Sequence, residues 1–347
     1  MTPRIDVGAA ARTPEAPGPG AVPTPVLRSL DIAIAKRIES LVPGEHLTPQ
    51  VGSGTELAMV RPYFPGDDVR HIDWNVTARM REPHVRVHVG ERALTSWVVL
   101  DVSASMVFGT AERRKVDVAE GVALAVGHVA TRRGNRLGVV AFGAGPASPD
   151  GSSPASPHTR VLRPRQGRLG LLGLLAQLRM QGEAEGAGRT SLGAVLRTTA
   201  ALGRQRGLIV IVSDFRGEQD WEEPLKALRA RHGVLAVEIR DPREQQLVPA
   251  GDLWLVDPET GRQLRVNTRR RKLRERFATA AASERDAVAA ALSRAGADHV
   301  VLSTDGDWLK TLAGHLRRGE AAMRATGAGS TRAAVAARLR SGGEAAR

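Results

Sequence analysis

The chain has 347 residues, enough for about two domains, and no cysteine, which excludes a disulfide framework, a thiolate zinc site and an iron–sulfur cluster. Its 50 basic and 37 acidic residues give a net charge of +13, but nearly all the basic residues are arginines in a sequence rich in Gly and Pro, so we attribute most of the charge to coding bias. Aromatic residues make up only 3% of the chain, which argues against stacking on single-stranded nucleic acid. No apolar run is long enough for a bilayer-spanning helix, and residues 1–20 lack the pattern of a signal peptide. We therefore expect a soluble cytoplasmic protein with no integral membrane segment.

The first part of the chain is predicted to form an arm and a small module. Residues 1–25 are rich in proline and are expected to be disordered. Over residues 26–92 we expect an amphipathic helix from Val26 to Leu41, followed by a charged, β-rich module. Within this module Pro65 and Gly66 fit the two central positions of a type II turn, so that the flanking acids and arginines can pair across it.

Residues 93–318 are predicted to form an α/β domain with a doubly wound, mainly parallel sheet, because short apolar strands alternate with longer helical segments. The expected strands are Trp97–Asp101, Arg136–Phe142, Arg160–Leu162, Leu208–Asp214, Val234–Ile239 and His299–Ser303. The expected helices are Glu112–Arg132, Arg168–Gln177, Ser191–Gly203, Trp221–Arg231, Arg270–Arg294 and Asp307–Arg317. Residues 143–158 are expected to form a loop, a hairpin interrupts the alternation near 241–268, and residues 319–347 are expected to be a flexible basic tail.

Oxygen-bearing side chains follow the carboxyl ends of these strands, where open α/β sheets place their ligand sites. Asp101, Ser103 and Ser105 alternate after one strand, so their side chains point the same way. Thr190 precedes a predicted helix, and Asp214 ends another strand. Two carboxylates and three hydroxyls suit a hard cation such as Mg²⁺, although Ser103, Thr190 and Asp214 also suit capping of helices or turns.

This order of residues resembles the von Willebrand factor A-like fold, whose metal-ion-dependent adhesion site combines D-x-S-x-S, a loop threonine and a strand-end aspartate. The resemblance implies that Mg²⁺, or else Mn²⁺ or Ca²⁺, is held by Asp101, Ser103, Ser105, Thr190 and Asp214, and that the metal binds a carboxylate of a partner protein. These loops contain no general base, and the G-x-S-x-G, H-E-x-x-H and Walker A motifs are absent from the chain. We therefore expect neither an enzyme nor a small-molecule substrate, and keep a metal-dependent hydrolase as an alternative.

A longer motif in the charged module makes the resemblance more specific. The pattern R-x-Y-x-P-G-D-D-x-R-x-I-D-W, with further basic and acidic positions after it, is similar to the bacterial domain-of-unknown-function 58 family. The residues that match are Arg61, Tyr63, Pro65, Gly66, Asp67, Asp68, Arg70, Asp73, Trp74, Arg79, Glu91 and Arg92. Family members are typically encoded beside a MoxR-type AAA+ ATPase, so the resemblance implies an adaptor that works with such an ATPase in assembling or activating other complexes.

Basic residues crowd the start of one predicted helix, where the helix dipole disfavours cations. They are Arg269, Arg270, Arg271 and Lys272. An internal carboxylate would offset this cost, and an acidic partner surface or nucleic acid would do the same from outside. Docking of a partner at these residues is therefore one expectation, and nucleic-acid binding through this helix and the basic tail is kept as the alternative function.

Overall fold

The computed structural model describes residues 19–20, 56–89, 94–131, 135–144, 157–167, 191–257 and 262–319. The helices expected at Val26–Leu41 and Arg168–Gln177 therefore lie outside the described residues, as do most of the N-terminal arm and the tail beyond residue 319. The same holds for three site residues predicted above, Thr190, Glu91 and Arg92.

The domain is built on a six-stranded sheet with the strand order β10-β7-β6-β3-β4-β5. The strands are β3 (Thr95–Asp101), β4 (Arg136–Ala144), β5 (Pro157–Gln166), β6 (Leu208–Ser213), β7 (Gly233–Arg240) and β10 (Asp298–Ser303). All neighbouring pairs are parallel except β4 and β5, which are antiparallel. This confirms the predicted von Willebrand factor A-like α/β sheet.

The edge strand β5 is the part of the sheet that the sequence described least well. Only its apolar centre, from Arg160 to Leu162, was predicted, whereas the strand runs from Pro157 to Gln166. Strand β4 likewise extends to Ala144, so the predicted loop over 143–158 was too long at both ends. An edge strand is exposed on one side and carries many polar residues, so its sequence lacks the continuous apolar run that marks the central strands.

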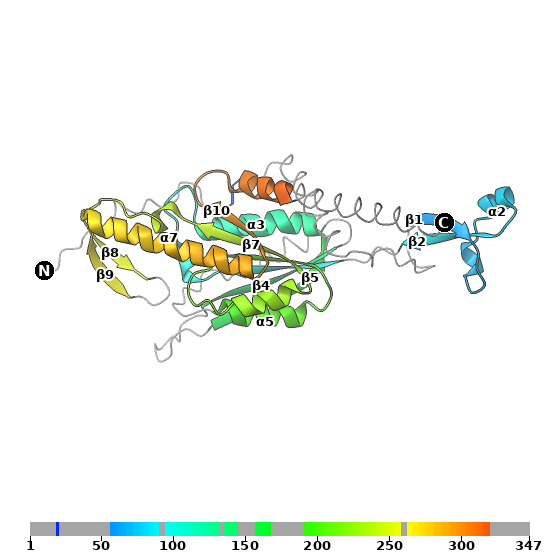
Figure 1. Ribbon diagram of the computed structural model, residues 1–347, viewed down its shortest axis with the longest axis horizontal. Coiled ribbons are helices and arrows are strands. Elements are labelled where there is room, and N and C mark those ends of the chain that lie inside the picture. Colours follow the sequence, from blue (N-terminus) through cyan, green and yellow to red (C-terminus); the bar gives the residue numbers. More distant parts are fainter. Residues whose placement is uncertain are drawn as a thin grey trace, which may run out of the picture.

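Helices cover both faces of the sheet (Figure 1). The alternation of side chains along β3 assigns them to the two cores. Val98 and Leu100 point into a core shared with α3 (Lys115–Ala130) and the helix over 308–319. Trp97 and Val99 point into a second core on the opposite face. The helices there are α5 (Leu192–Leu202), α6 (Glu222–Arg229) and α7 (Arg271–Arg294). Because both faces are buried, the central strands read as unbroken apolar runs.

Two smaller β-structures accompany the sheet. Strands β8 (Asp252–Val256) and β9 (Gln263–Asn267) form the antiparallel hairpin expected between 241 and 268. In the charged module β1 (Glu56–Pro62) pairs antiparallel with β2 (His84–Val89), and α2 (Trp74–Met80) lies between them in the chain. Short 3₁₀ turns complete the fold at Val69–His71 (η2), Ala104–Val107 (η3) and Pro242–Glu244 (η4).

Candidate metal centre

The predicted D-x-S-x-S segment forms a compact loop at the carboxyl end of β3. The carboxylate of Asp101 is buried, and it accepts hydrogen bonds from the Ser103 amide at 3.0 Å and from the Ser213 hydroxyl at 2.6 Å. The hydroxyls of Ser103 and Ser105 lie 3.1 Å apart. Although Ser103 occupies the N-cap position of η3, its side chain makes no capping hydrogen bond. The structure therefore brings three of the five predicted ligands together and leaves both serine hydroxyls directed at one another.

Asp214 reaches the same edge from the neighbouring strand β6 because the chain turns sharply after it. The next residue, Phe215, has a φ of 54°, which is unusual for a bulky side chain. Its ring is buried and packs edge-on against Trp221, with ring centroids 5.5 Å apart. This packing stabilises the turn, and Asp214 also accepts a hydrogen bond from the Arg216 amide at 3.0 Å, as predicted for a turn cap.

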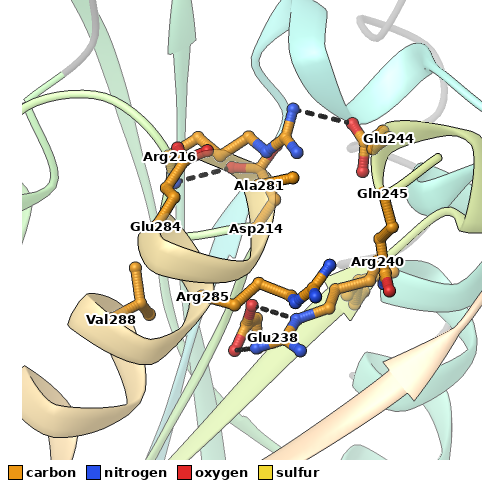
Figure 2. Close-up of a pocket in the computed structure, with 11 residues that line it drawn as sticks. Asp214, Arg216, Glu238, Arg240, Glu244, Gln245, Ala281, Glu284, Arg285 and Val288 are labelled. Carbon is orange, nitrogen blue, oxygen red and sulfur yellow. Dashed lines mark hydrogen bonds and ion pairs between the residues drawn. The ribbon is translucent and has the colours of Figure 1, made fainter. Parts of the chain in front are cut away.

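A lysine that the sequence analysis did not assign to the site lies within it. Lys115 is fully buried, and its ammonium donates to Asp214 and to Glu244, each at 2.7 Å. Arg216 adds a contact of 3.3 Å to the same oxygen of Glu244, and Figure 2 shows this pair beside Asp214 with α7 alongside. Lys115 is the first residue of α3, where the helix dipole disfavours a cation, so these carboxylates must hold it there.

The buried charges at this edge perturb one another. Burial, followed by repulsion from Asp214, raises the pKa of Asp101 to about 7. For Asp214 and Lys115, burial alone would favour the neutral forms, but their mutual attraction outweighs it. The pKa of Asp214 is consequently lowered and that of Lys115 is raised. Of the buried carboxylates here, Asp101 is thus the one whose negative charge lacks compensation.

These donors fit a hard cation. Carboxylate and hydroxyl oxygens are the ligands preferred by Mg²⁺, Mn²⁺ and Ca²⁺, and Asp101 has an uncompensated charge that a cation would neutralise. Within the described ranges no three His, Cys, Asp or Glu side chains form a metal-binding group. Ser191 is the N-cap of helix α5. Its hydroxyl donates a hydrogen bond to Asp220 and accepts one from the Ala194 amide.

In the charged module, an acid and an arginine pair across the turn at Pro65 and Gly66, as the sequence predicted. The turn at Pro65 and Gly66 closes with a hydrogen bond of 3.0 Å from the Asp67 amide to the Phe64 carbonyl, and Gly66 has a φ of 109°. Arg61 spans the turn with two contacts of 2.7 Å to Asp67. These contacts lower the pKa of Asp67.

A second ion pair ties the helix of this module to its strand. Asp73 caps α2 through the amides of Asn75 and Val76, and it accepts from Arg86 of β2 at 2.9 Å. Trp74 is the last residue of the motif that begins at Arg61. Its side chain is 70% exposed, so it does not contribute to a hydrophobic core.

The basic start of α7 is exposed. Arg269, Arg270, Arg271 and Lys272 all face solvent, and α7 begins without a side-chain cap. Arg271 pairs with Glu275 one turn further on, at 2.6 Å, which supplies the internal carboxylate expected for this helix. The expectation that these residues dock a partner stays a prediction.

The fold defines the class of protein: a von Willebrand factor A-like α/β domain preceded by a small charged module. The chain belongs to the family described as "Protein of unknown function DUF58", whose model matches residues 59–287. A relative in Mycobacterium tuberculosis (strain ATCC 25618 / H37Rv), "Uncharacterized protein Rv1480", is 38% identical over 286 residues, which cover 82% of this chain and 85% of the relative.

Two solved structures give weaker similarities. The conserved hypothetical protein BatB from Bacteroides thetaiotaomicron aligns with a TM-score of 0.40 and 14% identity, over 65% of this chain and 98% of that one. The manganese-loaded Plasmodium vivax TRAP protein aligns with a TM-score of 0.30 and 15% identity, over 42% of this chain and 57% of that one. In the part of the chain that the structure describes, no helix is both long and apolar enough to cross a membrane.

Proposed function

We propose that this protein is a metal-dependent adaptor, which binds a carboxylate of a partner protein through Mg²⁺ at the carboxyl edge of the sheet. The observation that supports this best is the buried Asp101, whose charge is uncompensated and whose neighbours Ser103 and Ser105 offer neutral oxygens. Asp101, Ser103, Ser105, Thr190 and Asp214 would hold the cation. A divalent cation with few direct carboxylate ligands keeps net positive charge, so it favours an external carboxylate as a further ligand.

In this proposal, neighbouring residues hold the two carboxylate ligands in place. Ser213 and the Ser103 amide orient Asp101, while Lys115 fixes Asp214. The described loops carry no histidine beside these carboxylates, so the proposal assigns binding and not hydrolysis. As the partner we propose a MoxR-type AAA+ ATPase, and as the setting the cytoplasm, with the protein assisting the assembly or activation of other complexes.

Loss of Asp101 is expected to abolish capture of the partner. Replacing Asp101 by alanine removes the buried carboxylate that accepts from the Ser103 amide. Immobilised D101A should therefore retain less than about a tenth of the MoxR-type ATPase that the wild type retains in MgCl₂, which corresponds to a loss of more than about 1.4 kcal/mol. EDTA should reduce wild-type capture to the same level. D286A, which removes an exposed carboxylate of α7, serves as the matched control and should behave as wild type. Equal recovery from all four samples would contradict the proposal.

Metal affinity is expected to depend on pH because protons compete for Asp101. With the pKa of this carboxyl raised to about 7, it is mostly protonated at pH 5.5 and mostly charged at pH 8. The association constant for Mg²⁺, measured by titration calorimetry, should therefore fall about tenfold per pH unit below 7 and level off above about pH 7.5. An affinity that stays constant between pH 5.5 and pH 8 would show that Asp101 is not a ligand.

The raised pKa of Asp101 also determines how the stability of the metal-free protein changes with pH. The pKa of Asp101 is higher in the folded than in the unfolded chain, so the folded state holds the extra proton between about pH 4 and pH 7. In EDTA, the contribution of Asp101 to the free energy of unfolding should thus be greatest below about pH 4, decline between about pH 4 and pH 7, and stay constant at higher pH. D101N removes this titration, and its unfolding should lose that part of the pH dependence.

A further inference from the structure

A groove with a volume of about 680 Å³ begins at the candidate metal centre. Asp101, Ser103 and Ser105 form one end of it. The rest comes from four other parts of the chain: the loop after η3, residues 214–218 after β6, the β8–β9 hairpin with the segment before it, and the first half of α7. It combines apolar side chains with charged ones, which outside the metal centre are those of Glu218, Arg243, Asp257 and Glu284. The apolar side chains that matter are Phe108, Leu247, Leu255, Val256 and Phe277.

Two of these five apolar side chains are exposed, and the other three are half-buried. Phe108 is 41% exposed and Val256 is 55% exposed. The chain has only five phenylalanines, and two of them line this one groove. Exposed apolar surface of this kind, bordered by polar groups, is typical of a site that another molecule covers. The hairpin, which has no role in the six-stranded sheet, supplies one wall.

The charge at the polar end determines which group fits there. At the metal centre itself, three carboxylates (Asp101, Asp214, Glu244) face two cations (Lys115, Arg216), which leaves one negative charge in excess there. The other charged residues of the groove, Glu218, Arg243, Asp257 and Glu284, are not part of this count. A bound divalent cation would change this to one positive charge in excess, and a single carboxylate would then neutralise it. The metal centre with its cation thus fits one acidic side chain, and the apolar residues of the groove fit a bulky apolar side chain beside it.

We infer that the groove selects a segment of the partner protein in which an aspartate or glutamate stands within two residues of a large apolar residue. This inference rests on the proposed function: the acidic side chain occupies the metal centre, and the apolar side chain packs between the hairpin and α7. The β8–β9 hairpin is thereby a specificity element. Arg243, which also lines the groove, adds attraction for the acidic residue.

Selection from a randomised nonapeptide display library tests the inference. The full-length protein is immobilised in MgCl₂, bound peptides are eluted with EDTA, and the eluted sequences are determined. The wild type should enrich peptides that carry Asp or Glu next to Leu, Ile, Phe or Met. L255S, which shortens the apolar wall, should still enrich acidic peptides but lose the apolar preference. It should also bind the leading wild-type peptide at least fivefold more weakly, as measured by fluorescence anisotropy.

Trp254 provides the matched control. It is the neighbour of Leu255 on the same strand, it is 59% exposed, and it does not line the groove. W254S should therefore select the same peptides as the wild type with unchanged affinity. Acidic peptides without an apolar preference, identical for wild type and L255S, would overturn the inference and leave the proposed function standing. An absence of acidic, EDTA-eluted peptides from the wild type would overturn both.

Discussion

Replacement of Lys115 by methionine is expected to lower the free energy of unfolding by about 3–5 kcal/mol, the cost of removing one partner from a buried ion pair. The ammonium is fully buried and serves two carboxylates, Asp214 and Glu244. Without it these groups would lie beside Asp101 with only Arg216 to compensate them. Chemical denaturation in EDTA measures the effect, and the melting temperature should fall by roughly 10 °C.

Two further variants separate charge from packing. Methionine has nearly the length of lysine, so the triple variant K115M/D214N/E244Q removes the charges on both sides and should recover most of the lost stability. The K115M variant should also bind Mg²⁺ at least tenfold more tightly than the wild type, because a competing cation is gone. If K115M unfolds within about 1 kcal/mol of the wild type, the ion pair is not essential to the fold.

The second large effect is expected at Asp241, which joins three segments of the chain. Its buried carboxylate accepts four hydrogen bonds: from the amide and hydroxyl of Thr110, from the hydroxyl of Thr304, and from the Arg243 amide. These contacts connect the end of β7 to the loop before α3 and to the end of β10. Replacement by alanine leaves these donors unpaired, so D241A should lose about 3–4 kcal/mol in the free energy of unfolding.

Asparagine and a surface aspartate are the controls for this prediction. D241N keeps the size of the side chain and one carbonyl acceptor, so it should lose about half as much as D241A. D252A removes an exposed ion pair of 3.0 Å to Arg265 and should change stability by less than about 0.5 kcal/mol. Equal losses in D241A and D252A would mean that the network around Asp241 contributes nothing.

The two stability predictions concern residues whose importance was not visible in the sequence. Lys115 lies 99 positions before Asp214 and 129 before Glu244, and Asp241 lies 131 positions after Thr110. Local patterns carry no information about which distant residues meet. One signal was available for Lys115: lysine is rare in this arginine-rich chain, and a compact ammonium fits a small buried site that a guanidinium does not.

The sequence by itself determined the α/β class, the central strands and the placement of Asp101, Ser103, Ser105 and Asp214 at one edge. It could do so because strands buried on both faces are continuously apolar, and because parallel strands bring their carboxyl ends to the same edge. The turn at Pro65 and Gly66 was equally predictable, since it depends on two adjacent residues.

Only the tertiary structure decided how charge is distributed at that edge. Burial and the distances between Asp101, Asp214, Glu244 and Lys115 set their pKa values, and these depend on how separate elements pack. The extent of β5 and the apolar groove beside the β8–β9 hairpin were likewise decided by packing. A hairpin can be recognised from its own residues, but the surface it forms with α7 depends on residues that come together only in the folded chain.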